Sequence, residues 1–210
     1  EDEGGARAIG AAHDGDRGIG QRHVDEHQPA AVGGDEPPHP VAQVEHRHAD
    51  GGYASRRTAC EAGAAALGFS SLRDASQADL ARACEILDDV TFRRVRHVIT
   101  ENQRVLDTVK TLRTDGPGAI GSLLYGSHKS MRDDFEISID ELDTAVETAL
   151  QHGAVGARMT GGGFGGAAIA LCPISKISEV ALAVEAEFSI LGYTKPDVFA
   201  VSAAAGARRE

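Results

Sequence analysis

The order of apolar patterns along the chain predicts an α+β fold with an antiparallel sheet and packed helices. Helix-periodic segments come first, between about residues 53 and 151. Strand-like runs follow at 154–160, 167–172 and 198–202. A glycine-rich loop joins the first two runs, and a helical pattern separates the second run from the third. Helices followed by strand, loop, strand, helix and strand are typical of this fold class.

Composition limits the class of protein. A chain of 210 residues suits one sizeable domain, with or without a tail. A net charge of −11 argues against nucleic acid as a partner, and no apolar run has the roughly 18 residues of a membrane span. The acidic N-terminus lacks the apolar core of a secretory signal. The three cysteines, Cys60, Cys84 and Cys172, form no CxxC pair, which suits free thiols in a cytoplasmic protein.

The first fifty residues differ from the rest of the chain. They contain no Leu, Phe, Tyr, Trp, Met, Lys or Cys, and they hold six of the nine histidines. Because such a segment buries little apolar surface, we predict disorder over residues 1–44. The histidines have no regular ligand spacing and no cysteine partners, so we favour a solvated tail over a metal site.

A second hypothesis explains the same composition. Gly, Ala, Arg, Asp, His and Pro without Lys, Phe or Tyr is what a GC-rich gene gives in a wrong reading frame. Residues 1–44 could then be a frame artefact joined to a genuine region at 45–205. An ordered structure within residues 1–44 would count against this hypothesis.

The first half of the remaining chain is predicted to be helical. A helix begins near Tyr53 and ends at Gly68, a residue type common just after a helix C-terminus. A short helix is expected over Asp79–Leu87 and a long one from about Asp88 to Arg113. Apolar residues recur at helical spacing along the long helix: Val90, Val95, Val98, Ile99, Val105, Leu106, Val109 and Leu112.

Three further helices are predicted closer to the C-terminus. A short one covers Ala119–Ser127, and amphipathic patterns mark Asp140–Gln151 and Ile177–Leu191. A polar turn follows the short helix over residues 126–138. The tail after Ala203 is expected to be frayed.

The glycine-rich loop is the main candidate for a ligand site. Its glycines are Gly161, Gly162, Gly163, Gly165 and Gly166. Glycines so close together favour positive φ values or a close approach to a ligand, and their N–H groups can form a concave nest for phosphate. The alternative is a glycine-rich turn without a ligand. A dinucleotide fingerprint needs a helix after the glycines, whereas a strand is predicted here, and no Gly-Lys-Ser/Thr of a Walker A loop follows.

Two polar clusters have both a functional and a structural interpretation. The arginines around Arg93–Arg96 could face phosphate or sugar, but we favour a face that is solvated or paired, here with Glu101. His128 lies beside Ser127, Ser130 and an Asp pair, which could suggest a hydrolase. Because triad partners normally come from distant segments, we favour a hydrogen-bonded turn that positions the glycine loop.

Three stretches resemble the galactokinases, within the GHMP small-molecule kinase superfamily. They are Gly-Ala-Arg-Met-Thr-Gly-Gly-Gly-Phe-Gly-Gly at 156–166, Ser-His-Lys-Ser-Met-Arg-Asp-Asp-Phe-Glu-Ile-Ser at 127–138, and Tyr-Ala-Ser-Arg-Arg-Thr-Ala-Cys-Glu at 53–61. Residues 93–104 also resemble the family's Arg-x-x-His-Val-x-x-Glu-x-x-Arg helix. The resemblance covers roughly residues 46–202.

The resemblance implies a fold and a reaction. The fold is a GHMP-kinase C-terminal domain of ferredoxin-like topology, over about 115–205. The reaction is the ATP-dependent phosphorylation of galactose to galactose 1-phosphate, with Mg²⁺, by a cytoplasmic enzyme expected to be a monomer. Tyr53 is the implied sugar contact. The family usually has Glu before this tyrosine, where this chain has Gly52.

The family's N-terminal motifs do not occur in this sequence. They include its Gly-Leu-Ser-Ser-Ser-Ala phosphate loop, its catalytic Asp and Arg and its magnesium ligands. We therefore assign no catalytic or metal-binding residue, and we expect this chain alone to be inactive. Two alternatives stay open: a non-catalytic sugar-binding or regulatory module derived from a galactokinase, and a fragment of another GHMP kinase.

Overall fold

The computed structural model describes residues 6–12 and 49–201 of the chain. In chain order the helices and strands are β1 (Ala6–Ala12), α1 (Ala49–Leu67), α2 (Leu80–Ile86), α3 (Asp89–Thr114), α4 (Gly121–Ser130), a π-helical turn (Met131–Phe135), α5 (Asp140–Gln151), β2 (Gly156–Thr160), β3 (Ala167–Pro173), α6 (Ile177–Leu191) and β4 (Asp197–Val201). Short 3₁₀ turns lie at 72–74, 77–79, 117–119 and 174–176.

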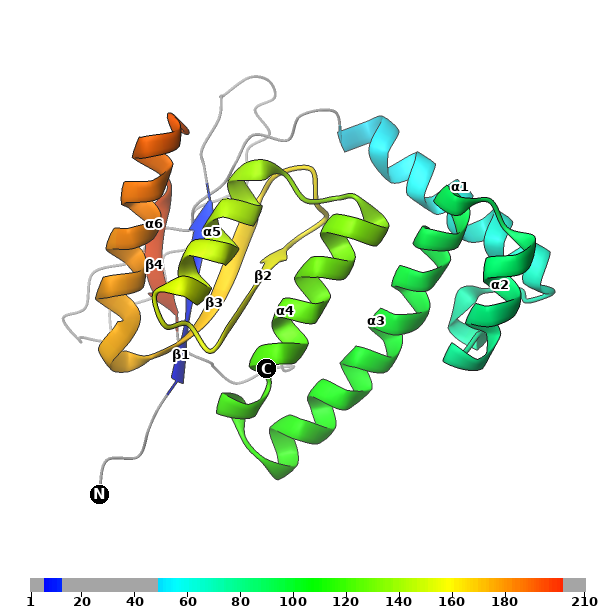
Figure 1. Cartoon of the computed structure of the whole chain (residues 1–210), viewed down its shortest axis with the longest axis horizontal. Coiled ribbons are helices and arrows are strands. Elements are labelled where there is room, and N and C mark those ends of the chain that lie inside the picture. Colours follow the sequence, from blue (N-terminus) through cyan, green and yellow to red (C-terminus); the bar gives the residue numbers. More distant parts are fainter. Residues whose placement is uncertain (1–5, 13–48, 202–210) are drawn as a thin grey trace, which may run out of the picture.

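The described strands form one antiparallel sheet in the order β2-β3-β1-β4. Helices α5 and α6 cover one face of this sheet, and α4 lies beside β2 (Figure 1). Going outward from α4, Figure 1 shows α3 and then α1 with α2. Along the chain the elements follow one another as strand, helices, strand, strand, helix and strand. This chain order, combined with the sheet order β2-β3-β1-β4, is the ferredoxin-like topology. The predicted α+β class and antiparallel sheet are thus confirmed.

Strand β1 lies inside the segment for which composition predicts disorder. Its backbone pairs with β3 from Ala6 to Ala11 and with β4 from Ala8 to Ala12. Ladder hydrogen bonds use backbone N–H and C=O groups, which a segment poor in large apolar side chains also carries. The frame-artefact hypothesis stays a prediction. The other residues of 1–44, and the predicted frayed tail, lie outside the described residues.

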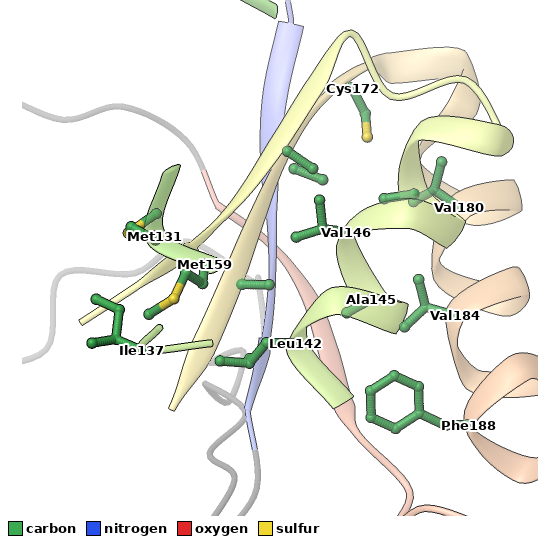
Figure 2. Close-up of a cluster of buried hydrophobic side chains, with 14 residues drawn as sticks. Met131, Ile137, Leu142, Ala145, Val146, Met159, Cys172, Val180, Val184 and Phe188 are labelled. Atoms are coloured by element: carbon green, nitrogen blue, oxygen red, sulfur yellow. The ribbon is translucent and has the colours of Figure 1, made fainter. Parts of the chain in front are cut away.

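The larger apolar core lies between the sheet and the helices α5 and α6 (Figure 2). Its buried residues are Met131, Ile137, Leu142, Ala145, Val146, Ala149, Ala157, Met159, Ala168, Ala170, Cys172, Val180, Val184 and Phe188. The strands contribute every second residue, as in β3, where Ala168, Ala170 and Cys172 are buried. This core holds β2 and β3 in place, and with them the two ends of the glycine loop.

A smaller apolar cluster joins α1, α2 and the first half of α3. Its buried residues are Ala64, Leu67, Leu72, Ala83, Val95 and Ile99. Helix α1 ends as predicted: Gly68 has φ 79°, and the Phe69 N–H donates to the Ala64 carbonyl at 2.9 Å. The cluster positions α1, which carries Tyr53.

Sequence patterns located most helix ends to within a few residues. Helices α5 and α6 have the predicted bounds, and α3 is shifted by one residue because Asp88 is its N-cap and accepts a hydrogen bond from the Thr91 N–H at 3.0 Å. Helix α4 begins two residues later than predicted and ends at Ser130. The helical backbone continues beyond Ser130 as the π-helical turn at Met131–Phe135, so part of the segment predicted to be a polar turn is helical.

Candidate functional site

The glycine loop connects β2 to β3 as predicted, and most of its residues have left-handed φ values. These are Gly161 (91°), Gly163 (88°), Phe164 (61°), Gly165 (126°) and Gly166 (105°). Gly162 is outside this region, so φ alternates over 161–163, an arrangement that turns successive N–H groups to one side. The Phe164 N–H already donates to the Ile137 carbonyl at 2.7 Å. This bond ties the loop to the polar turn.

Close packing explains two of the five glycines. A Cβ atom on Gly162 would overlap the Tyr53 hydroxyl, and one on Gly163 would overlap Ile137. At Gly161 a Cβ would have no neighbour within 4 Å among the described residues, so there only the positive φ requires glycine. The side of the loop at Gly161 is therefore open to a ligand, whereas the side at Gly162 and Gly163 is filled by the protein itself.

Tyr53 lies directly against this loop, 44% exposed. Its ring meets the Phe164 ring edge to face, with 5.5 Å between the centroids. A side chain at position 52 would overlap the same Phe164 ring, which gives a physical reason for Gly52 where the family usually has Glu. The structure thus brings together the two groups of residues that the sequence singled out.

Arg56 links α1 to both the glycine loop and the polar turn. Its Nε donates to the Phe135 carbonyl at 2.6 Å, and Nη2 donates to the Glu136 carbonyl at 2.7 Å. The guanidinium also lies 5.5 Å from the centroid of the Phe164 ring. Burial lowers its pKa, and nearby Arg94 lowers it further. Sequence analysis did not select Arg56, although it lies three residues after Tyr53 in the motif at 53–61.

The basic cluster of α3 is paired, but not with the predicted partner. Arg93 and Arg94 bind the Glu136 carboxylate, and Arg96 binds Asp134. Hydrogen bonds from Arg93 and Arg94 lower the pKa of Glu136 to about 2. The predicted pairing with Glu101 is wrong for these three arginines, because they reach carboxylates that the fold brings from about forty residues away. It is confirmed only for Arg104, at the end of the same motif.

Glu101 instead belongs to a separate cluster beside β2. It forms ion pairs with Arg104 and, at 3.6 Å, with Arg158, and its carboxylate accepts a hydrogen bond from the Ser127 hydroxyl. Burial is the main cause that lowers the pKa of Arg158. The cluster fixes the strand that leads into the glycine loop.

The Ser-His motif is a hydrogen-bonded turn, as favoured from the sequence. The fully buried His128 accepts a hydrogen bond from the Met159 N–H at Nδ1, 3.2 Å away. Its Nε2 therefore carries the proton and lies 3.1 Å from Asp143 Oδ1, although off the line of a hydrogen bond. The Ser130 hydroxyl lies 2.9 Å from His97 Nδ1. Neither serine lies against His128 as a nucleophile would.

The described residues offer no cluster for Mg²⁺. No group of three or more His, Cys, Asp or Glu side chains suited to a metal occurs among residues 6–12 and 49–201. We therefore derive no step through Mg²⁺. The glycine loop therefore stays the candidate site for phosphate that the sequence predicts. None of the helices in the described part of the chain has the length and apolar content needed to cross a membrane.

Comparisons with known proteins agree with this architecture. Residues 108–190 match the family model for the C-terminal domain of GHMP kinases. The chain is 50% identical over 169 residues to a galactokinase of Streptomyces coelicolor, covering 80% of this chain and 44% of the relative. It is 49% identical over 166 residues to a galactokinase of Mycobacterium bovis, with 79% and 46% covered.

A solved structure extends the likeness to the fold. The crystal structure of Lactococcus lactis galactokinase complexed with galactose matches with a TM-score of 0.70 and 27% identity, over 93% of this chain and 44% of that one. Over residues 108–190 the chain is therefore similar to the GHMP kinases. Within them it is related to the galactokinases, of which it corresponds to the C-terminal portion. It spans less than half the length of the curated relatives that it matches.

Proposed function

We propose that this chain supplies the sugar-contacting tyrosine and the phosphate-side glycine loop of a galactokinase. The reaction is the transfer of a phosphoryl group from ATP to the anomeric hydroxyl of galactose, and the proposal places it in the cytoplasm. The observation that carries the proposal is the contact between Tyr53 and the loop at Gly162. A sugar at Tyr53 would lie next to a phosphate held at the open side of Gly161.

In this proposal the chain binds and orients its ligands, and other residues carry out the chemistry. The Tyr53 hydroxyl donates to or accepts from a sugar hydroxyl, and the loop N–H groups neutralise phosphate charge. Arg56 is a positioning residue, because it fastens α1 to the loop and to the turn at Phe135. Mg²⁺ would neutralise phosphate charge if bound, and the resemblance implies that its ligands belong to the family's N-terminal motifs. The chain alone is then expected to bind galactose without turning it over.

Calorimetric titration with galactose tests the first part of the proposal. We expect binding by the full chain and weaker binding by Tyr53→Phe, because one hydrogen bond to the sugar is lost. Tyr193→Phe is the matched control. It also removes a tyrosine hydroxyl, but Tyr193 packs against Phe188 in the core between the sheet, α5 and α6. Equal affinity for galactose in all three proteins would contradict a sugar contact at Tyr53.

Release of ADP in the presence of ATP, Mg²⁺ and galactose tests the second part. We expect none from the chain alone, because positioning and charge stabilisation by the missing motifs are required for phosphoryl transfer. Turnover near that of the intact Streptomyces relative would contradict this expectation. Binding that persists without turnover, even when the rest of a galactokinase is supplied, would favour the sugar-binding module.

A further inference from the structure

Five consecutive backbone carbonyls between α4 and α5 each accept a hydrogen bond from a distant part of the chain. We call them the carbonyl row, and they belong to Asp133, Asp134, Phe135, Glu136 and Ile137. Arg93 and Arg94 of α3 bind the first two carbonyls, and Arg56 of α1 binds the next two. The N–H of Phe164, in the glycine loop, binds the fifth at 2.7 Å. Two helices and the glycine loop therefore meet along one short stretch of backbone.

The carbonyl row needs outside donors because it lies at the end of a helix. The helical backbone of α4 continues through the π-helical turn to Phe135, and Glu136 then leaves the helix with φ 50°. Carbonyls at a helix C-terminus lack a donor within the helix, and cationic side chains suit them. Arginine combines its charge with several N–H groups, so that one side chain can serve two acceptors. Arg56 does so at 2.6 and 2.7 Å.

The Glu136 carboxylate keeps the two arginines of α3 in place. Arg93 and Arg94 bind one carboxylate oxygen each while they also donate to the carbonyl row. Arg94 is 3% exposed, and hydrogen bonds are stronger where water is excluded. In the described part of the chain the hydrogen bonds of these two side chains go to Asp89 and to residues 133–136. Their influence on the glycine loop must therefore pass through the carbonyl row.

The glycine loop needs a contact that selects one conformation. Glycine adopts φ values of either sign, so its glycines alone do not fix the path of the backbone. Phe164 is the one loop residue that is not glycine, and its φ of 61° is unfavourable for a bulky side chain. Its bond to Ile137 is the only backbone hydrogen bond that residues 161–165 make to other described residues. Ile137 is itself fixed, because its N–H donates to the Met131 carbonyl at 3.0 Å.

We propose that the carbonyl row sets the conformation of the glycine loop, with Arg93 and Arg94 as positioning residues for the phosphate side of the site. When the first four carbonyls are held, the fifth presents its oxygen to Phe164 at a fixed place. Arg56 also contacts the Phe164 ring, so it connects the row to α1 and to Tyr53. The role toward phosphate rests on the proposed function, whereas the positioning of the loop does not.

Hydrogen exchange at the Phe164 N–H, followed by NMR in the full chain, tests the proposal. Arg94→Lys keeps the positive charge, but an ammonium group does not replace the guanidinium at both the Asp134 carbonyl and Glu136. We expect the Phe164 N–H to exchange about tenfold faster or more in Arg94→Lys than in the native chain. Arg96→Lys is the matched control and should leave this exchange rate unchanged. Arg96 also lies on α3, but it binds the carboxylate of Asp134.

The Met159 N–H distinguishes positioning from a general loss of stability. Met159 lies on β2, shortly before the glycine loop, and its N–H donates to His128 Nδ1 at 3.2 Å. If Arg94 only stabilised the fold, Arg94→Lys would speed exchange at Met159 and Phe164 alike. Positioning through the carbonyl row predicts faster exchange at Phe164 alone. Equal acceleration at both amides, or none at Phe164, would overturn the proposal.

Titration with inorganic tripolyphosphate separates this proposal from the proposed function. The amide signals of the loop glycines report binding, and we expect Arg94→Lys to bind about fivefold more weakly or less than that, because its loop is no longer preorganised. Equal affinity in Arg94→Lys and the native chain would overturn the role toward phosphate. If the native chain binds no tripolyphosphate while Phe164 exchange still responds to Arg94→Lys, the positioning of the loop stands and the proposed function fails.

Discussion

The two apolar clusters of this protein contrast in size and in how they are joined. The cluster between the sheet, α5 and α6 has fourteen buried residues, and the cluster between α1, α2 and α3 has six. Polar contacts connect them: Arg94 to the Asp134 carbonyl, and Ser130 to His97. The larger core resembles that of an independent domain. The helices α1, α2 and α3 are held to the rest of the molecule by specific hydrogen bonds. Tyr53, on α1, belongs to this helical part.

Truncation of one buried side chain in each cluster should show the contrast most strongly. We expect Leu142→Ala to lower the free energy of unfolding by about 3 to 4 kcal/mol, and Ile99→Ala by about 2 kcal/mol. The small helical cluster can collapse around the lost atoms more easily than the sheet core. Urea denaturation followed by circular dichroism measures both values. An equal or larger loss for Ile99→Ala would remove the contrast.

Removal of the buried guanidinium between the clusters should have a comparable effect. Arg94 is 3% exposed and binds both the Asp134 carbonyl and Glu136. We expect Arg94→Met to cost about 2 kcal/mol, since it leaves the buried Asp134 carbonyl without its donor and removes one of the two arginines that bind Glu136. Arg57→Met, at an exposed pair with Glu61, is the control and should leave the urea midpoint unchanged. A neutral Arg94→Met would mean that polar contacts do not hold the clusters together.

The contact between Tyr53 and the glycine loop should be sensitive to a single methyl group. We expect Gly162→Ala to cost about 1 to 2 kcal/mol, because the new Cβ would overlap the Tyr53 hydroxyl. Adding Tyr53→Ala should relieve most of this overlap in a double-mutant cycle. Gly118→Ala is the control, because in the described part of the chain no atom lies within 4 Å of the added Cβ, and Gly118 has no positive φ. Additive losses in the cycle would argue against the contact.

Low pH should also weaken the polar contacts between the two clusters, and we expect this to lower the stability less than the substitutions above. The pKa of Glu136 is lowered from 4.5 to about 2, chiefly by hydrogen bonds from Arg93 and Arg94. A depressed carboxyl pKa stabilises the fold above the unfolded value, and this stability is lost as pH falls from about 4.5 toward 2. The urea midpoint should therefore drop over this range in the native protein. Glu136→Gln should lack the part of this drop that comes from Glu136. A pH profile of Glu136→Gln identical to that of the native protein would contradict the prediction.

Local patterns were sufficient to predict the helices and three of the four described strands. The bounds of α5 and α6 follow from amphipathic spacing alone. Strand β1 was missed because Ile9 is its only large apolar residue, while its pairing uses only the backbone. Arg56 was missed because nothing in its local sequence shows that it reaches Phe135, 79 positions away.

The sequence by itself determined the α+β class, the glycine loop between two strands, and the resemblance to galactokinases. These depend on periodicity, turn chemistry and motifs, which are local properties. Only the tertiary structure decided that Tyr53 lies against Gly162 and that Glu136 rather than Glu101 pairs with Arg93 and Arg94. Such features depend on which surfaces meet when distant segments pack, because contacts across many residues leave no trace in local spacing.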